Sequence, residues 1–141
     1  MSRYLLDTVT LSELRKKTKA DATVLRWQYA AQGQQAGVSV VTMNEIWYGC
    51  RKVAAQDPAF AQRLEIWFDE ILAAPALYNI LPISLDIAKQ AAEIRAAHGT
   101  PYNDALIAAT ALVYGLTLAT RNEADFTGTG VTVVNPWQWQ P

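Results

Sequence analysis

The sequence has 141 residues, a length typical of one domain, and 51% of them are hydrophobic, which excludes a disordered chain. Its formal net charge of −1 lacks the basic excess of a dedicated nucleic-acid-binding protein. A local basic patch could still bind a polyanion transiently, or be a solvated helix end; it consists of Arg15, Lys16, Lys17 and Lys19. The single cysteine, Cys50, excludes an intrachain disulfide and indicates a reducing compartment, so we expect a cytoplasmic protein.

The chain is not expected to enter a membrane. The stretch between Arg3 and Asp7 is much shorter than the ~7–15 apolar residues of a signal-peptide core. The longest stretch without charged residues covers residues 105–120, which is shorter than the ~20 residues of a membrane helix. Because Gly115 divides this stretch, we expect a buried helix followed by a buried strand.

The first half of the chain alternates strand-like and helix-like segments. We predict a strand over Tyr4–Leu6, a short helix over residues 11–17, and a helix over residues 20–32 that Gly33 and Gly37 end. The valine-rich alternation of residues 38–42 predicts a second strand, and a helix over residues 43–53 follows.

The second half continues the alternation. Asp57 and Pro58 begin a helix whose apolar residues recur at helical spacing, and residues 78–83 form the third predicted strand. Ser84 caps a helix that extends to residue 97, and a strongly apolar helix covers Tyr102–Tyr114. Strands over residues 116–119 and 131–134 complete the pattern. We therefore predict one domain over residues 1–141, a three-layer α/β/α sandwich around a five-stranded, mainly parallel sheet.

Polar side chains follow several of the predicted strands. The carboxyl ends of parallel strands share one edge of a sheet, and ligands bind there near the topological switch point. Asp7 follows the first strand, Glu45 lies just past the second, and Asp104 opens the long apolar helix. The segment after the fourth strand adds Thr120, Arg121, Asn122 and Asp125. We expect these four distant segments to meet at one edge.

Carboxylates that converge in this way favour a divalent cation. They repel one another and would take up protons unless a cation neutralised them. Oxygen ligands without histidine suit Mg²⁺, or Mn²⁺ as a substitute, and the single His98 cannot supply a histidine-rich zinc site. We also expect the helix dipole to keep Asp104 and Glu45 ionised, because both are predicted near helix N-termini. One or two Mg²⁺ ions held by carboxylates commonly act on phosphates by activating water.

Each carboxylate also has a purely structural interpretation. Asp7 could occupy a turn or cap a helix, Glu45 could be a solvated first-turn residue, Asp104 could cap the helix after Pro101, and Asp125 could lie on the surface. The combination of acidic residues on four segments favours a site over these separate explanations.

Four short motifs span nearly the whole chain. They are YLLDT at residues 4–8 with LSEL at 11–14, NEI at 44–46 with Gly49, NDALIAATA at 103–111, and LATRN at 118–122 followed by Asp125 and Phe126. NPW at 135–137 closes the pattern. Together they resemble the PIN domain, and specifically the VapC-type toxin ribonucleases of bacterial toxin–antitoxin pairs. The third and fourth motifs, at their relative spacing, are the most specific.

The resemblance implies a PIN-like fold and a Mg²⁺-dependent endoribonuclease toxin, in a family for which transfer RNA is a common substrate. It implies that Asp7, Glu45 and Asp104 bind the metal. Either Asn122 or Asp125 would be the fourth ligand, and we favour Asp125. The implied polar support comes from Thr8, Thr120 and Asn122.

The resemblance also implies partners, namely a small antitoxin that covers the acidic site and a second copy of the chain in a homodimer. Trp27, Trp47 and Trp67 could line an apolar groove for the antitoxin, although Trp67 is more typical of a core residue. Trp137 and Trp139 could be exposed at a dimer edge.

One position departs from the family pattern. The family usually has asparagine two residues after the first aspartate, and this chain has Val9, which cannot form a side-chain hydrogen bond. This leaves open a catalytically weak module that binds an antitoxin peptide without efficient cleavage. A third hypothesis, a phosphatase or phosphotransferase with Asp7 as nucleophile, fails at Val9 and leaves Glu45 unexplained. Metal titration separates the nuclease from the peptide-binding module.

Overall fold

A computed structural model describes residues 2–31 and 34–141. The first half of the chain contains β1 (Tyr4–Leu6), α1 (Thr8–Leu14), the 3₁₀ turn η1 (Lys17–Lys19), α2 (Ala22–Ala30), β2 (Ala36–Ser39) and α3 (Val40–Val53). The second half contains α4 (Pro58–Leu72), β3 (Tyr78–Leu81), α5 (Leu85–His98), α6 (Tyr102–Tyr114), β4 (Thr117–Ala119), η2 (Glu123–Phe126), β5 (Val133–Val134) and η3 (Pro136–Gln138).

The five strands form one parallel sheet in the order β3-β2-β1-β4-β5. The chain adds β2 and β3 on one side of β1, and later adds β4 and β5 on the other side. The switch point therefore lies between β1 and β4, whose register pairs Leu6 with Ala119. The residues that follow these two strands, Asp7 and Thr120, come to lie at the place where α/β sheets usually bind ligands.

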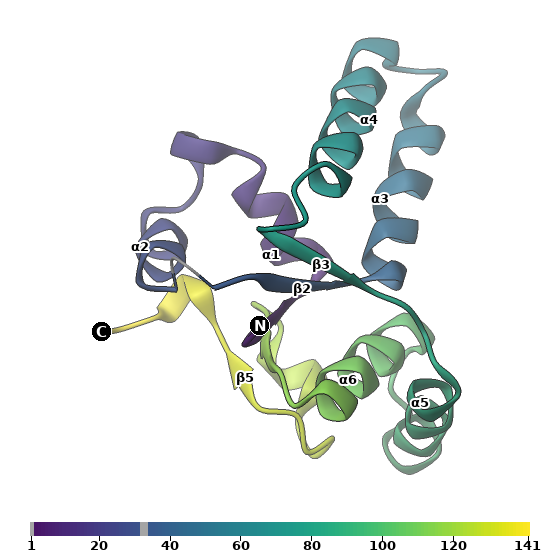
Figure 1. Ribbon diagram of the computed structural model, residues 1–141. Coiled ribbons are helices and arrows are strands. Elements are labelled where there is room, and N and C mark those ends of the chain that lie inside the picture. Colours follow the sequence, from purple (N-terminus) through teal and green to yellow (C-terminus); the bar gives the residue numbers. More distant parts are fainter. Residues whose placement is uncertain (1, 32–33) are drawn as a thin grey trace.

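Helices cover both faces of the sheet, which confirms the predicted three-layer α/β/α architecture (Figure 1). Alternate residues of a strand point to opposite faces, so Leu5 packs in the core beneath α5 and α6. Leu6 packs in the second core, with side chains from α1 to α4 such as Trp27 and Met43. Both leucines are at most 2% exposed, so β1 is buried between two layers.

The helix starts follow ordinary capping chemistry. Asp7, Ser39, Asp57 and Ser84 each accept a backbone N–H from the first turn of the helix that follows. The cap at Asp57 with Pro58 and the cap at Ser84 are as the sequence predicts. The cap at Asp7 has a second consequence, because it fixes one oxygen of a carboxylate at the switch point.

The structure corrects the predicted boundary between the second strand and the next helix. Residues 38–42 were expected to form a strand, but β2 ends at Ser39 and α3 already includes Val40, Val41 and Thr42. The side chain of Ser39 accepts the N–H of Val41 at 3.0 Å and begins the helix there. Burial of Val41 and Thr42 against the sheet outweighs the strand preference of β-branched residues.

Smaller differences occur elsewhere. Helix α1 begins at Thr8 rather than residue 11, and Lys17 belongs to η1, not to the first helix. Gly37 does not end a helix but pairs with Leu5 within the sheet, while the predicted ends at Gln32 and Gly33 lie outside the described residues. Among the described residues, no helix has the length and apolar character required to cross a membrane.

Candidate functional site

Asp7 is the most firmly held of the acidic side chains. Its Oδ1 accepts the backbone N–H of Thr10 at 2.8 Å, and its Oδ2 accepts the Thr120 hydroxyl at 2.5 Å. Thr10 and Thr120 are fully buried, and Asp7 is 7% exposed. The Thr10 hydroxyl in turn donates to the carbonyl oxygen of Ala119 at 2.8 Å. These bonds join α1 to the end of β4 and fix Asp7 at the switch point.

Glu45 reaches the same region from α3. The Thr8 hydroxyl donates to Glu45 Oε1 at 3.1 Å and also lies 3.3 Å from the hydroxyl of Thr42. Burial raises the pKa of Glu45 above its ordinary value; the hydrogen bond from Thr8 opposes this shift, and the charges of Asp104 and Asp7 add to it. Glu45 is thus close enough to both aspartates to feel their charge.

The position of Glu45 also corrects a prediction. It is not beside a helix N-terminus, because α3 begins at Val40 and Glu45 lies in the second turn. The helix dipole acts mainly within the first turn, so it does little to keep Glu45 ionised.

Asp104 lies in the first turn of α6, where the helix dipole does favour its charged form. Burial nevertheless raises the pKa of Asp104, and the nearby charges of Asp125 and Asp7 raise it further. The cap of α6 is Pro101, without a side-chain hydrogen bond, so Asp104 is not the capping residue. Its carboxylate remains half-exposed and free to bind a ligand.

Asp125 and Asn122 lie on the turn that follows β4. Asp125 is exposed in η2, and its charge is the second cause of the raised pKa of Asp104. Asn122 precedes η2, and its backbone N–H donates to the Thr120 hydroxyl at 3.1 Å. The two residues therefore contribute differently: the charge of Asp125 acts on Asp104, whereas the backbone of Asn122 tightens the turn that holds Thr120.

Asp7, Glu45, Asp104 and Asp125 thus form one electrostatically linked group, which we call the acidic edge. Within residues 2–31 and 34–141, the one ion pair joins Lys16 to Glu13 at 2.9 Å, so no lysine or arginine neutralises the acidic edge at salt-bridge distance. The charges of neighbouring carboxylates add to the raised pKa values of Glu45 and Asp104, so a cation bound here would relieve that repulsion.

The carboxylates of the acidic edge lie farther apart than the ligands of one metal ion. In the part of the chain that the structure describes, no three side chains among histidine, cysteine, aspartate and glutamate lie close enough to bind one ion. The donors are all carboxylate oxygens, which fits Mg²⁺ or Mn²⁺ chemically. Half-exposed Glu45 and Asp104 could approach Asp7 by side-chain rotation, since Asp7 itself is fixed.

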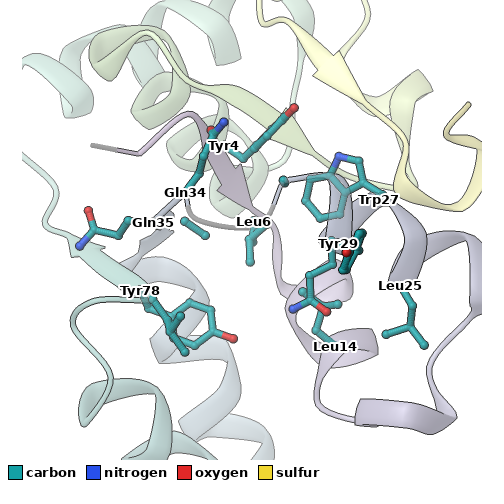
Figure 2. Close-up of a pocket in the computed structure, with 13 residues that line it drawn as sticks. Tyr4, Leu6, Leu14, Leu25, Trp27, Tyr29, Gln34, Gln35 and Tyr78 are labelled. Carbon is teal, nitrogen blue, oxygen red and sulfur yellow. The ribbon is translucent and has the colours of Figure 1, made fainter. Parts of the chain in front are cut away.

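A second feature is an apolar groove on the α1–α4 side of the sheet, formed by two adjoining hollows, of which Figure 2 shows the smaller. One part is a hollow of about 400 Å³ lined mainly by apolar and aromatic side chains, among them Tyr4, Leu25, Trp27 and Tyr78. It shares Leu25, Leu77 and Tyr78 with a more open hollow of about 750 Å³. In the described residues, the indole N–H of Trp27 is the one buried side-chain polar atom without a hydrogen-bond partner.

The tryptophans divide between the groove and other places. Trp27 lines the groove, and Trp67 lines the larger hollow while packing on the core. Trp47 was expected there too, but among the described residues it lines neither hollow, and its ring lies 5.0 Å from that of Phe68. Trp137 and Trp139 are half-buried rather than exposed.

Sequence reasoning missed Thr42 and Thr10, which support the acidic edge. Thr42 precedes Glu45 by three residues and so shares its helix face, but assigning Thr42 to a strand hid that relation. Thr10 follows Asp7 by three residues, the spacing of a helix cap, which was a usable signal.

Comparison with known proteins gives a consistent result. The family model described as the PIN domain matches residues 4–130. The chain is 33% identical to the VapC ribonuclease Y4jK of Sinorhizobium fredii, over 95% of this chain and 97% of that protein. Its structure is similar to that of FitAcB from Neisseria gonorrhoeae, with a TM-score of 0.77, 27% identity, and coverage of 96% and 99% of the two chains. A toxin–antitoxin complex from Klebsiella pneumoniae is similar at a TM-score of 0.68 and 29% identity, over 96% of this chain and 99% of that one.

Proposed function

The chain belongs to the PIN domain family, and from that premise we propose that it is the endoribonuclease toxin of a toxin–antitoxin pair, dependent on Mg²⁺ or Mn²⁺. One observation carries the proposal. Carboxylates from four segments lie within electrostatic range of one another at one edge of the sheet, and no lysine or arginine of the described residues lies at salt-bridge distance from them. The name of the relative from Sinorhizobium fredii, a VapC ribonuclease, supports RNA as the substrate.

The carboxylates of the acidic edge would have different roles in binding the ion. Asp7, fixed by Thr10 and Thr120, would hold the ion in a constant position. Glu45 from α3 and Asp104 from α6 would supply two further carboxylates to the ion, which would offset the cost of keeping them charged that their raised pKa values reflect. Asp125 would supply the fourth carboxylate. When bound, a divalent ion supplies charge neutralisation and water activation for phosphodiester hydrolysis.

The experiment is cleavage of a mixed-sequence RNA by the purified chain, with Mg²⁺, with Mn²⁺ and with EDTA. Asp7→Asn and Asp104→Asn should each abolish cleavage while the far-ultraviolet circular dichroism spectrum stays unchanged. Asp86→Asn is the matched control, because Asp86 also lies in the first turn of a helix but outside the acidic edge. Full cleavage in EDTA, or full activity of Asp104→Asn, would contradict the proposal.

We further propose that the apolar groove binds a segment of the antitoxin. The complex from Klebsiella pneumoniae is described as a toxin–antitoxin pair, which supports such a partner here. The larger hollow adds cations to an apolar surface, since Arg15 lies over the rings of Phe60 and Trp67 and Arg63 lies over Phe60. An amphipathic segment with acidic flanks would fit this surface. A homodimer is also part of the proposal.

Val9 favours a second candidate function, a module that binds an antitoxin without efficient cleavage. This residue is 43% exposed in α1, next to Thr8, where it offers no hydrogen bond. If the family's asparagine at that position is needed for efficient cleavage, the chain would act mainly as a module that binds its antitoxin. Tight antitoxin binding with no RNA cleavage under any metal condition would favour this alternative.

A further inference from the structure

Arg121 lies beside the acidic edge without belonging to it. It directly follows Thr120, whose hydroxyl donates to Asp7 Oδ2 at 2.5 Å, so its side chain starts from the same edge of the sheet. Strand β5 runs parallel to β4, and the N–H of Thr120 donates to the carbonyl oxygen of Val134 at 3.0 Å. The segment that follows β5, including Trp137, therefore also emerges at this edge.

The guanidinium of Arg121 rests on the indole of Trp137. Its central carbon lies 5.2 Å from the ring centroid, within the range of a cation–π contact. The backbone that carries Trp137 is held in place, since the side chain of Asn135 accepts the backbone N–H of Trp137 at 3.0 Å and donates to Glu123 at 3.4 Å. A guanidinium that contacts an aromatic ring through its face keeps its N–H groups available to a ligand.

The charge of Arg121 is available to a ligand. Arg121 is exposed, and within the described ranges no carboxylate lies at salt-bridge distance from it. Its nearest acidic sequence neighbour, Glu123, is hydrogen-bonded to Asn135 instead. A positioned guanidinium with free N–H donors suits a phosphate, which it can bind through two parallel hydrogen bonds.

An RNA strand that approaches the acidic edge meets repulsion from its carboxylates. A bound divalent ion offsets this only at the reacting phosphate, and neighbouring phosphates still need cations. On the basis of the proposed function, we infer that Arg121 binds a phosphate of the RNA strand beside the reacting one, and that Trp137 positions it. Arg121 is then a substrate-binding residue, and Trp137 is a positioning residue.

The test compares Arg121→Gln with Arg3→Gln. Arg3 provides a matched control because it is exposed and stacks on Tyr4 at 5.4 Å, but precedes β1 at the opposite edge of the sheet. In steady-state cleavage of a fluorescein-labelled single-stranded RNA, Arg121→Gln should raise KM by about tenfold and leave kcat within about twofold, since the lost contact is made to a phosphate that takes no part in bond cleavage. Arg3→Gln should leave both unchanged.

A second readout is the salt dependence of binding, measured by fluorescence anisotropy in the Asp104→Asn background. Loss of one phosphate contact should reduce the slope of log affinity against log salt by about 0.7. Arg121→Lys should keep the slope, because it keeps the charge, while binding RNA more weakly without the planar fork. Trp137→Ala should weaken binding less than Arg121→Gln and add little to it in the double variant.

The outcomes separate this inference from the proposed function. If the unaltered chain cleaves RNA and Arg121→Gln matches Arg3→Gln in KM and in salt slope, the inference is wrong and the proposed function stands. If Arg121→Gln instead weakens only the affinity for the antitoxin, Arg121 contacts an acidic side chain of that partner and the inference is overturned. If the unaltered chain neither binds nor cleaves RNA, the proposed function fails and the inference fails with it.

Discussion

Replacing Thr120 by valine tests how strongly the fold depends on fixing Asp7. Valine keeps the shape of threonine but lacks the hydroxyl that donates to Asp7 Oδ2 at 2.5 Å and accepts the N–H of Asn122 at 3.1 Å. Thr120 is fully buried and Asp7 is 7% exposed, so water replaces the lost donor poorly. A hydrogen bond to a buried charged group contributes about 1.5–3 kcal/mol. We expect a loss of that size in the free energy of unfolding.

The loss should be visible in two assays. For a domain of this size, each kcal/mol corresponds to roughly 4 °C in Tm, so Thr120→Val should unfold about 6–12 °C lower. Because the hydroxyl orients a proposed metal ligand, Mn²⁺ affinity measured by calorimetry should fall by about 10–100-fold. Thr120→Ser, which restores the hydroxyl, is the control. A Thr120→Val protein within about 0.5 kcal/mol of the original, with unchanged Mn²⁺ affinity, would refute the reasoning.

Three further perturbations have defined outcomes. The raised pKa values of Glu45 and Asp104 mean that protonation of these groups stabilises the folded chain. This contribution to the free energy of unfolding is complete when the pH is below the pKa of the group in the unfolded chain. It is lost as the pH rises through the pKa of the group in the folded chain. In EDTA, Glu45→Gln and Asp104→Asn should therefore raise Tm at pH 7 and give a smaller gain at pH 4. A lower Tm at pH 7 would contradict the raised pKa values that burial and the neighbouring carboxylates give these groups. Val9→Asn should raise kcat/KM severalfold in the RNA cleavage assay, and an unchanged rate would show that the departure at this position is neutral. Leu77, which is 60% exposed in the groove, should tolerate no charge in the antitoxin complex, so Leu77→Asp should weaken antitoxin binding at least tenfold while RNA cleavage persists. The control Leu85→Asp, on α5, should bind the antitoxin normally. Equal antitoxin binding by the two variants would show that the groove is not part of the interface.

The sequence was informative where one local signal determined one element. The β-branched and apolar stretches located all five strands to within a few residues, and their alternation with helices predicted a parallel sheet. The order of strands was not readable, because it depends on which apolar faces pack together rather than on local preference. The placement of Asp7 and Asp104 followed from a strand end and a helix start, both of which are local signals.

Glu45 shows where local reasoning fails. Its position depends on where α3 begins, and three β-branched residues obscured that boundary because tertiary burial overrides their intrinsic preference. An error of three residues moved Glu45 from the second turn to the first and suggested a dipole effect that the structure does not support. The bond between Thr8 and Glu45 depends on the same boundary and spans 37 positions, so no local pattern contained it.

The groove was less accessible to prediction than the acidic edge. Which tryptophans line it depends on how α2 and α4 pack against the sheet, and Trp47 faces Phe68 instead. The contact of Arg121 with Trp137 joins segments on adjacent strands, so it required the sheet order before it could be recognised.

The most direct measurement is the anomalous scattering of Mn²⁺ in crystals of the full chain. We expect a peak bounded by the carboxylates of Asp7, Glu45 and Asp104, with Asp125 beside it and with metal–oxygen distances near 2.2 Å. The peak should disappear in Asp104→Asn crystals soaked in the same way. Manganese bound elsewhere on the surface, with these carboxylates still apart and unligated, would contradict a shared metal site at the switch point.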